Sequence, residues 1–198
     1  MKCDFEATVA AVRACEICKP QLPLGPRPVF QISQTARILV AAQAPGRRVH
    51  ETGIPFNDPS GERLRSWMGI DRVTFYDAAK TALLPMGFCY PGTGKSGDLP
   101  PRRECAEHWR HQLLALLPDI QLTLVIGQYA QAWHLGERQK DNLTETVKNW
   151  KEYWPRVLAL PHPSPRNNLW LRKNPWLEED ILPVLKGRVR QLLGVYFL

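Results

Sequence analysis

The sequence predicts an α/β protein with three layers (α/β/α), in which helices cover both faces of a central four-stranded parallel sheet. Two observations lead to this prediction: short, mostly apolar runs recur along the chain, and segments with a helical spacing of apolar residues separate them. Strands that alternate with helices in this way form parallel sheets with right-handed crossovers. A length of 198 residues suits one well-cored domain, so we expect residues 1–198 to form a single domain.

Local patterns predict the individual elements. Four apolar runs of strand length are expected to form the sheet: residues 36–42, 81–84, 122–127 and 156–160. Apolar residues at helical intervals predict helices over residues 5–16, from Ser60 past Met68, over 104–117, after Gly127, and from Ile181 to Leu192. Prolines, glycines and other turn-forming residues predict loops between them: residues 19–28, 43–58, 85–101 and 161–168.

Composition limits the classes of function. Apolar residues make up 44% and charged residues 23% of the chain, as in ordinary globular proteins, and no apolar run approaches the length of a membrane span. Residues 1–6 lack the apolar core of a signal peptide, so we expect a cytoplasmic location and no membrane partner. We also expect a monomer. The formal charge of +7 is compatible with a polyanionic partner, although a merely basic protein has the same charge.

The loop after the first predicted strand carries residues suited to ligand binding. In parallel sheets ligands bind at the carboxyl ends of strands, and small residues such as Ala44 let backbone amides approach a ligand closely. Phe56 offers a stacking face, and Asp58 offers a carboxylate that can orient or deprotonate a water molecule. Two structural alternatives stay open: Phe56 can be a core residue, and Asp58 can cap the helix that begins near Ser60.

The loop after the last predicted strand places His162 between rigid proline turns. A histidine in such a sequence is commonly only a turn residue. A neutral histidine held there can instead donate a hydrogen bond to an oxyanion that develops on a leaving group. Arg166, four residues later, can enter a nucleic-acid duplex or pair with a phosphate.

Together the two loops resemble the two signature motifs of the uracil-DNA glycosylase superfamily. Residues 41–61 resemble the first motif throughout, and the ending from Asp58 to Gly61 looks most like the branch whose water-orienting aspartate lies there. Residues 162–165, His-Pro-Ser-Pro, match the second motif residue for residue, and residues 124–130 resemble the superfamily's penultimate strand and following helix. The resemblance runs, with gaps, from about Val12 to Trp170.

The resemblance implies a DNA glycosylase that hydrolyses the N-glycosidic bond of uracil or a related deaminated base and leaves an abasic site in the DNA. It implies catalytic roles for His162 and Asp58. The other roles that it implies are base binding by Gln43, Ala44 and Phe56, and DNA binding by Ser164 and Arg166. One alternative is a non-catalytic DNA-binding or lesion-binding module with the same fold. Another is a nucleotide- or RNA-processing enzyme on a similar sheet.

Four of the five cysteines form two pairs, Cys15 with Cys18 and Cys89 with Cys105. Such thiolates can hold a zinc ion or a four-iron cluster, and their spacing does not separate these possibilities. Here the chain resembles the thermostable uracil-DNA glycosylases, which carry a 4Fe-4S cluster on cysteines at similar places. The resemblance therefore implies a structural 4Fe-4S cluster on these four cysteines, with Cys3 outside the site. Zinc is one alternative, and buried free thiols at one or more of these positions are another.

Two positions depart from the pattern of these relatives. Pro85 stands where the relatives carry an asparagine that reads the edge of uracil, and Gln43 stands where the cysteine-bearing relatives usually have glutamate. A proline has no amide donor in its side chain or backbone. Either backbone groups of residues 85–89 take over this contact, or the target is another deaminated base.

Overall fold

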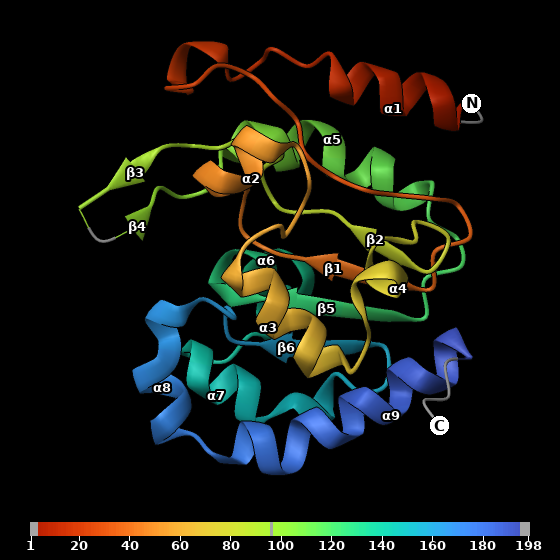
Figure 1. Cartoon of the computed structure of the whole chain (residues 1–198), viewed down its shortest axis with the longest axis vertical. Helices are drawn as coiled ribbons and strands as arrows, with labels where there is room; N and C mark the ends of the chain where they lie inside the picture. Colours follow the sequence, from red (N-terminus) through yellow and green to blue (C-terminus); the bar gives the residue numbers. More distant parts are fainter. Residues whose placement is uncertain (1–3, 96, 195–198) are drawn as a thin grey trace.

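The computed structural model describes residues 4–95 and 97–194 of the chain. In this part four strands form one parallel sheet in the order β2-β1-β5-β6 (Figure 1). Their bounds are β1 (Ile38–Ala41), β2 (Thr81–Leu83), β5 (Leu122–Ile126) and β6 (Val157–Leu160). The fold class and all four predicted strands are confirmed, although each strand is one to three residues shorter than the apolar run that predicted it.

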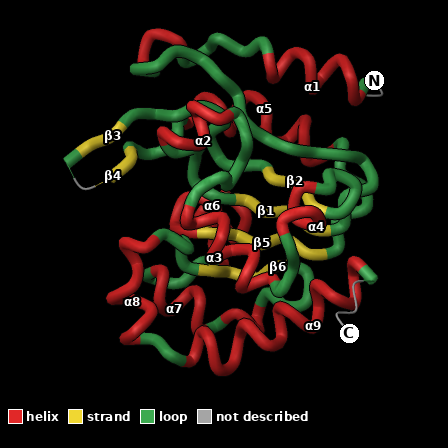
Figure 2. Tube along the Cα trace, viewed as in Figure 1, coloured by secondary structure: helices red, strands yellow, loops and turns green. Residues whose placement is uncertain are grey.

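Buried strands explain why the sequence shows continuous apolar runs rather than alternation. All four residues of β1 are buried, and their side chains belong to two separate cores. Ile38 and Val40 pack in the core that contains side chains of α3 (Pro59–Met68) and α9 (Leu182–Leu193), whereas Leu39 packs in the core of α1 (Phe5–Arg13) and α5 (Arg103–Ala115). Helices therefore cover both faces of the sheet, which makes three layers (Figure 2).

The remaining helices are short. They are α2 (Arg47–Thr52), α4 (Arg72–Tyr76), α6 (Gly127–Leu135), α7 (Leu143–Lys148) and α8 (Asn168–Lys173). In Figure 1, α3 lies in front of the sheet and α6 behind it. A π-helical stretch (Leu177–Ile181) leads into α9. In the part of the chain that the structure describes, no helix combines the length and the apolar character needed to cross a membrane.

The structure corrects three boundaries. The predicted helix over residues 5–16 ends at Arg13, so that Cys15 and Cys18 lie in the turns after it. The predicted loop 43–58 contains α2, which Gly46 precedes and Gly53, in the left-handed conformation, ends. The predicted loop 85–101 contains a two-stranded antiparallel hairpin, β3 (Thr93–Gly94) and β4 (Gly97–Asp98). Elements of two to six residues are too short to show a periodic apolar pattern, because one turn or one strand pair buries few side chains.

Candidate active site

A pocket of about 400 Å³ opens where β1, β2 and β6 end. The loops after these strands line it, as expected for the carboxyl edge of a parallel sheet. Every predicted site residue apart from the cysteines lines this one pocket: Gln43, Ala44, Phe56, Asp58, His162, Ser164 and Arg166. The fold thus brings together two loops that lie more than 100 residues apart in the sequence.

Phe56 forms one wall of the pocket in a strained backbone conformation. Its φ of 55° makes it the only non-glycine residue with positive φ in the described part of the chain. The ring packs edge-on against Phe75 at 6.0 Å between centroids, so Phe56 contacts the core and also faces the pocket. Gly61, in the first turn of α3, permits this conformation, because a Cβ atom there would lie 1.8 Å from the Phe56 carbonyl oxygen.

We therefore expect Gly61→Ala to lower stability strongly. The new methyl group meets backbone rather than a flexible side chain, and overpacking of this kind costs about 1–3 kcal/mol or more. In a domain of this size such a loss lowers the melting temperature by roughly 3–10 °C. Gly187→Ala on α9 is the matched control, since nothing lies within 4 Å of its Cβ position and alanine favours a helix. Equal melting temperatures for the two variants would contradict the packing argument.

Asp58 is the N-cap of α3. Its Oδ1 accepts a hydrogen bond from the Gly61 backbone N–H at 2.8 Å. The capping alternative is therefore confirmed, yet the same side chain lines the pocket, so the cap fixes the carboxylate at the wall. A carboxylate has two acceptor oxygens, and the cap occupies one of them.

His162 is held as a neutral imidazole. Its Nδ1 accepts a hydrogen bond from the Ser164 backbone N–H at 3.2 Å, which leaves the proton of the neutral ring on Nε2. Burial lowers the pKa of His162 below its usual value of 6.5, and the negative charges of Asp58 and Asp98 only partly oppose this decrease. At neutral pH the ring is therefore a hydrogen-bond donor without a charge.

Side chains that the sequence analysis missed hold the His162 loop in place. Asn167 Nδ2 donates to the His162 carbonyl at 2.7 Å. Arg63, on α3, donates to the Ser164 carbonyl at 3.1 Å and to Asn168 Oδ1 at 2.8 Å. Arg63 thus connects the helix that Asp58 caps with the loop that carries His162. No local pattern distinguishes Arg63 from the other basic residues of the sequence, because its partners lie about 100 residues away.

Pro85 lines the pocket, and the backbone that follows it is already hydrogen-bonded. The N–H groups of the next three residues donate to the Ala42 carbonyl, the Gln43 carbonyl and Cys105 Sγ, at 2.7, 3.0 and 3.4 Å. The Pro85 carbonyl accepts from Arg110 at 3.0 Å. The suggestion that this segment reads a ligand through its backbone is therefore weakened, because these three donors are in use.

Arg110 is fully buried behind this segment. Besides the Pro85 carbonyl, Arg110 donates to the Leu84 carbonyl at 3.2 Å and contacts His134 Nε2 at 2.8 Å. Burial lowers the pKa of Arg110 to about 9, and burial together with the Arg110 charge lowers the pKa of His134 to about 3. His134 is therefore neutral and accepts the hydrogen bond, which fixes Arg110 against the strand end that leads to Pro85.

Comparison with known families shows the superfamily to which the chain belongs. Residues 29–186 match the family model described as the uracil DNA glycosylase superfamily. This match covers well over half of the chain. The chain belongs to the uracil DNA glycosylase superfamily. The superfamily match includes both pocket loops, Cys89 and Cys105, and it begins after Cys15 and Cys18. Membership supports a function of the DNA glycosylase type.

All four cysteines of the predicted metal site in this superfamily member line a single cavity on the α5 side of the fold: Cys15, Cys18, Cys89 and Cys105. They form no disulfide. Trp109 Nε1 donates to Cys15 Sγ at 3.2 Å, and burial raises the pKa of Cys89 to about 11 and that of Cys105 to about 12. Within residues 4–95 and 97–194, no group of three or more His, Cys, Asp or Glu side chains could hold a metal ion as it stands.

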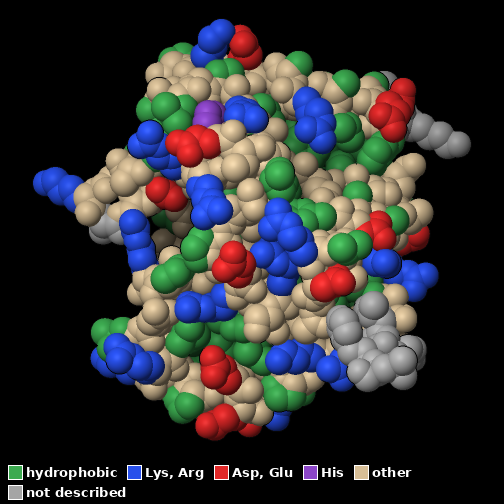
Figure 3. All heavy atoms as spheres, viewed as in Figure 1, with side chains coloured by type: hydrophobic (Ala, Val, Ile, Leu, Met, Phe, Trp, Pro, Cys, Tyr) green, Lys and Arg blue, Asp and Glu red, His purple; other side chains and the backbone are tan. Residues whose placement is uncertain are grey.

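Basic side chains stand on the segments that border the pocket. Exposed arginines and a lysine come from α2, the hairpin and the His162 loop: Arg47, Arg48, Lys95 and Arg166. Figure 3 shows Lys and Arg side chains on the hairpin and across the face around α2. Positive charge around a pocket attracts a polyanion such as DNA and makes binding sensitive to salt.

Proposed function

We propose that this protein is a DNA glycosylase that hydrolyses the N-glycosidic bond of a deaminated base, uracil or a relative of uracil, and leaves an abasic site. The observation that carries the proposal is the pairing of a neutral, fixed His162 with the Asp58 carboxylate in one pocket whose wall is the Phe56 ring. Superfamily membership agrees with this reaction class. Excision assays on oligonucleotides with single damaged bases test it.

The reaction needs no covalent intermediate on the protein. The target nucleotide leaves the helix at a cost of about a few kcal/mol, and Phe56 stacks on its base while Gln43 and Ala44 contact the base edge. The bond between C1′ and the base nitrogen breaks, and its electron pair goes to the base. His162 Nε2–H donates to the departing anion. A water oxygen then bonds to C1′, and its proton passes through Asp58 to the released base.

Asp58→Asn separates the catalytic role of Asp58 from its structural role. Asparagine caps a helix as well as aspartate does, so the melting temperature should change little. The uncharged amide neither accepts the water proton nor offsets positive charge on the sugar, so we expect excision to slow by about 10²-fold. Single-turnover rates measure this effect. Asp71→Asn, the same exchange at the N-cap of α4, is the control, and an equal effect in both variants would remove Asp58 from the mechanism.

DNA contacts in this proposal come from the pocket rim. Ser164 and Arg166 lie on the loop that carries His162, and Arg47 and Arg48 lie on α2 next to Gly46. We infer that these side chains bind phosphates on either side of the extruded nucleotide. Phosphate contacts release counterions, so the affinity for DNA should fall steeply as salt rises.

We also propose that the cysteine cavity holds a structural 4Fe-4S cluster, as in the iron-sulfur branch of the superfamily. Cys15, Cys18, Cys89 and Cys105 are the ligands, and the donor set is all sulfur. The N–H donor of Trp109 to Cys15 is the kind of contact that stabilises a cluster thiolate. The bound group would fasten residues 14–22 and the segment after β2 to α5.

A second candidate function is a module that binds damaged DNA without cleaving it. Pro85 favours this alternative, because the amide side chain that reads uracil in relatives is missing there. A protein that binds DNA with a damaged base and releases no base under any condition would support the alternative.

We further propose that residues 1–198 act as one domain and as a monomer in the cytoplasm. Two hydrophobic cores on the two faces of one sheet support a single domain. Sedimentation of the purified protein checks the monomer.

A further inference from the structure

Asp98 is a pocket carboxylate to which the proposed mechanism gives no role. It is the last residue of β4 and lines the same pocket as Phe56 and His162. The negative charges of Asp98 and Asp58 both act to raise the pKa of His162, against the lowering caused by burial. The sequence analysis placed it in a loop without regular structure, where nothing marked it as a site residue.

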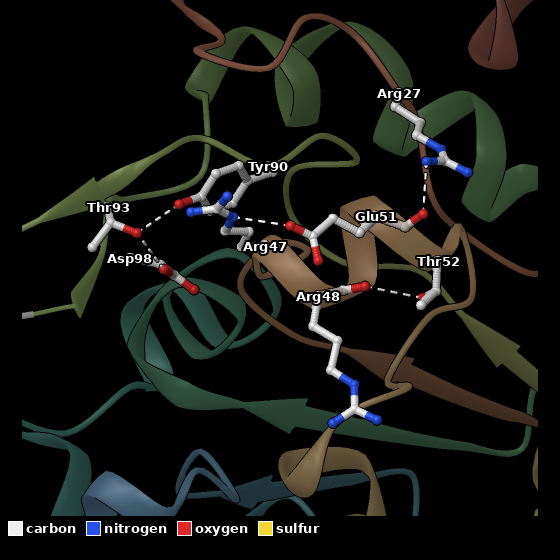
Figure 4. Close-up of polar contacts among 8 residues, drawn as sticks. All are labelled: Arg27, Arg47, Arg48, Glu51, Thr52, Tyr90, Thr93 and Asp98. Carbon is white, nitrogen blue, oxygen red and sulfur yellow. Dashed lines mark hydrogen bonds and ion pairs between the residues drawn. The ribbon is translucent and has the colours of Figure 1, made fainter.

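A chain of hydrogen bonds holds Asp98 in place. Thr93 Oγ1 donates to Asp98 Oδ1 at 3.3 Å, and the Tyr90 hydroxyl lies 2.5 Å from Thr93 Oγ1 (Figure 4). Because the Thr93 hydroxyl has only one proton, Tyr90 is the donor to Thr93. Tyr90 itself is buried, and Thr93 pairs with Asp98 across the hairpin. These two hydrogen bonds therefore occupy Oδ1 and hold the carboxylate in place.

The other oxygen, Oδ2, belongs to the wall that is proposed to contact the base. A Cβ atom added to Gly46 would lie 3.3 Å from Oδ2. Gln43 Nε2 donates to the carbonyl of Leu99, the residue after Asp98, at 3.1 Å. The hairpin end is thus attached to the Gln43–Gly46 segment, whereas Asp58 is attached to α3. Asp98 is therefore attached to the segment that we propose contacts the base.

The hydrogen-bond donors next to Pro85 in this wall are already in use. Pro85 has no amide, the next three backbone N–H groups are engaged, and the Gln43 side-chain amide donates to Leu99. An ionised carboxylate is only an acceptor, so its natural partner is an N–H group of the base. Deamination creates such a group: cytosine and adenine have a bare ring nitrogen on the pairing edge, and uracil and hypoxanthine have a ring N–H at that place.

We propose that Asp98 Oδ2 accepts the ring N–H that deamination creates and so distinguishes uracil and hypoxanthine from cytosine and adenine, the bases from which they form. Asp98 is then a specificity-determining residue that contacts the base. This inference rests on the proposed glycosylase function and names the group that replaces the missing asparagine.

The test removes the N–H from the base and the carboxylate from the protein in turn. Single-stranded oligonucleotides carry either uracil or N3-methyluracil, and kcat/KM is measured for each base. The wild-type protein should prefer uracil by about 10²-fold or more, because the methyl group blocks the acceptor. Asp98→Ala should excise uracil about 10–100-fold more slowly and should lose most of this preference, since the smaller side chain leaves room for the methyl group. Asp98→Asn keeps an acceptor oxygen and should keep the preference for uracil.

Asp119→Ala, an exchange at an exposed residue before β5, is the matched control, and melting temperatures show that each variant is folded. A loss of preference in Asp98→Ala but not in Asp98→Asn supports the inference. If Asp98→Ala slows both substrates equally and keeps the preference, Asp98 does not read the base, and the inference is wrong while the glycosylase proposal stands. A wild-type protein that releases no base overturns the glycosylase proposal and this inference with it.

Discussion

His162→Ala should lower the rate of base excision by about 10²–10³-fold and leave DNA affinity nearly unchanged. The loss is large because a donor fixed at the place where negative charge develops stabilises the transition state more than the bound substrate. The imidazole is fixed through Nδ1 by the Ser164 N–H, so its only remaining donor is Nε2–H. Single-turnover excision and equilibrium DNA binding, measured on the same preparation, separate the two effects.

His108→Ala, at an exposed position on α5, is the control for this substitution. The pH dependence gives a second check. Since burial holds the pKa of His162 below 6.5, the ring is already neutral at pH 7, and raising the pH should not change its role. Excision by the wild-type protein should therefore not rise between pH 7 and 8 through titration of this histidine. If His162→Ala keeps the wild-type rate, His162 has no role in the chemistry.

Loss of a single cavity cysteine should have the largest effect on stability. Cys105→Ser should reduce bound iron to near zero and lower the melting temperature by about 10 °C or more, because binding of a structural metal group contributes directly to folding free energy. Cys105 lies on α5, Cys89 after β2 and Cys15 after α1, so the cavity connects three segments distant in sequence. Iron, sulfide and zinc content and visible absorbance measure the occupant.

Cys3→Ser is the matched control, since Cys3 stands outside the predicted ligand set and outside the described residues. It should keep the iron content and the melting temperature of the wild-type protein. Zinc without iron in the purified wild-type protein would show that the cysteines bind zinc and not a cluster. A protein with no metal and an unchanged melting temperature in Cys105→Ser would mean that the thiols are ordinary core residues.

The sequence predicts the sheet well because its strands are buried on both faces. The strands are mostly apolar runs: β1 is apolar throughout, and β5 is interrupted only by Thr123. Such runs can be recognised without knowledge of distant partners. The short elements could not be predicted this way. α2 buries only Val49 and His50, and the β3–β4 hairpin pairs two residues with two, so neither leaves a periodic pattern.

The residues of the pocket also divide into those that a local sequence pattern reveals and those that it does not. His162, Asp58 and Phe56 could be found because each lies in a compact sequence motif in the connection that follows a strand, and the fold then brings them together. Asp98, Arg63 and Arg110 could not be found, because their importance comes from contacts with residues distant in sequence or from hairpin geometry. The departure at Pro85 could be seen in the sequence. Its consequence, a nearby backbone without spare donors, becomes clear only from the structure.

The most direct test of the central claim is the product of a reaction with damaged DNA. End-labelled oligonucleotides with uracil, hypoxanthine or xanthine, in single strands and in mismatched duplexes, are incubated with the wild-type protein and with His162→Ala, then treated with alkali. Glycosylase activity predicts a free base and an alkali-sensitive abasic site at the damaged position, with both products nearly lost in the variant. DNA that is bound but stays intact, with no free base from any of the three lesions, would contradict the claim and favour a protein that only binds damaged DNA.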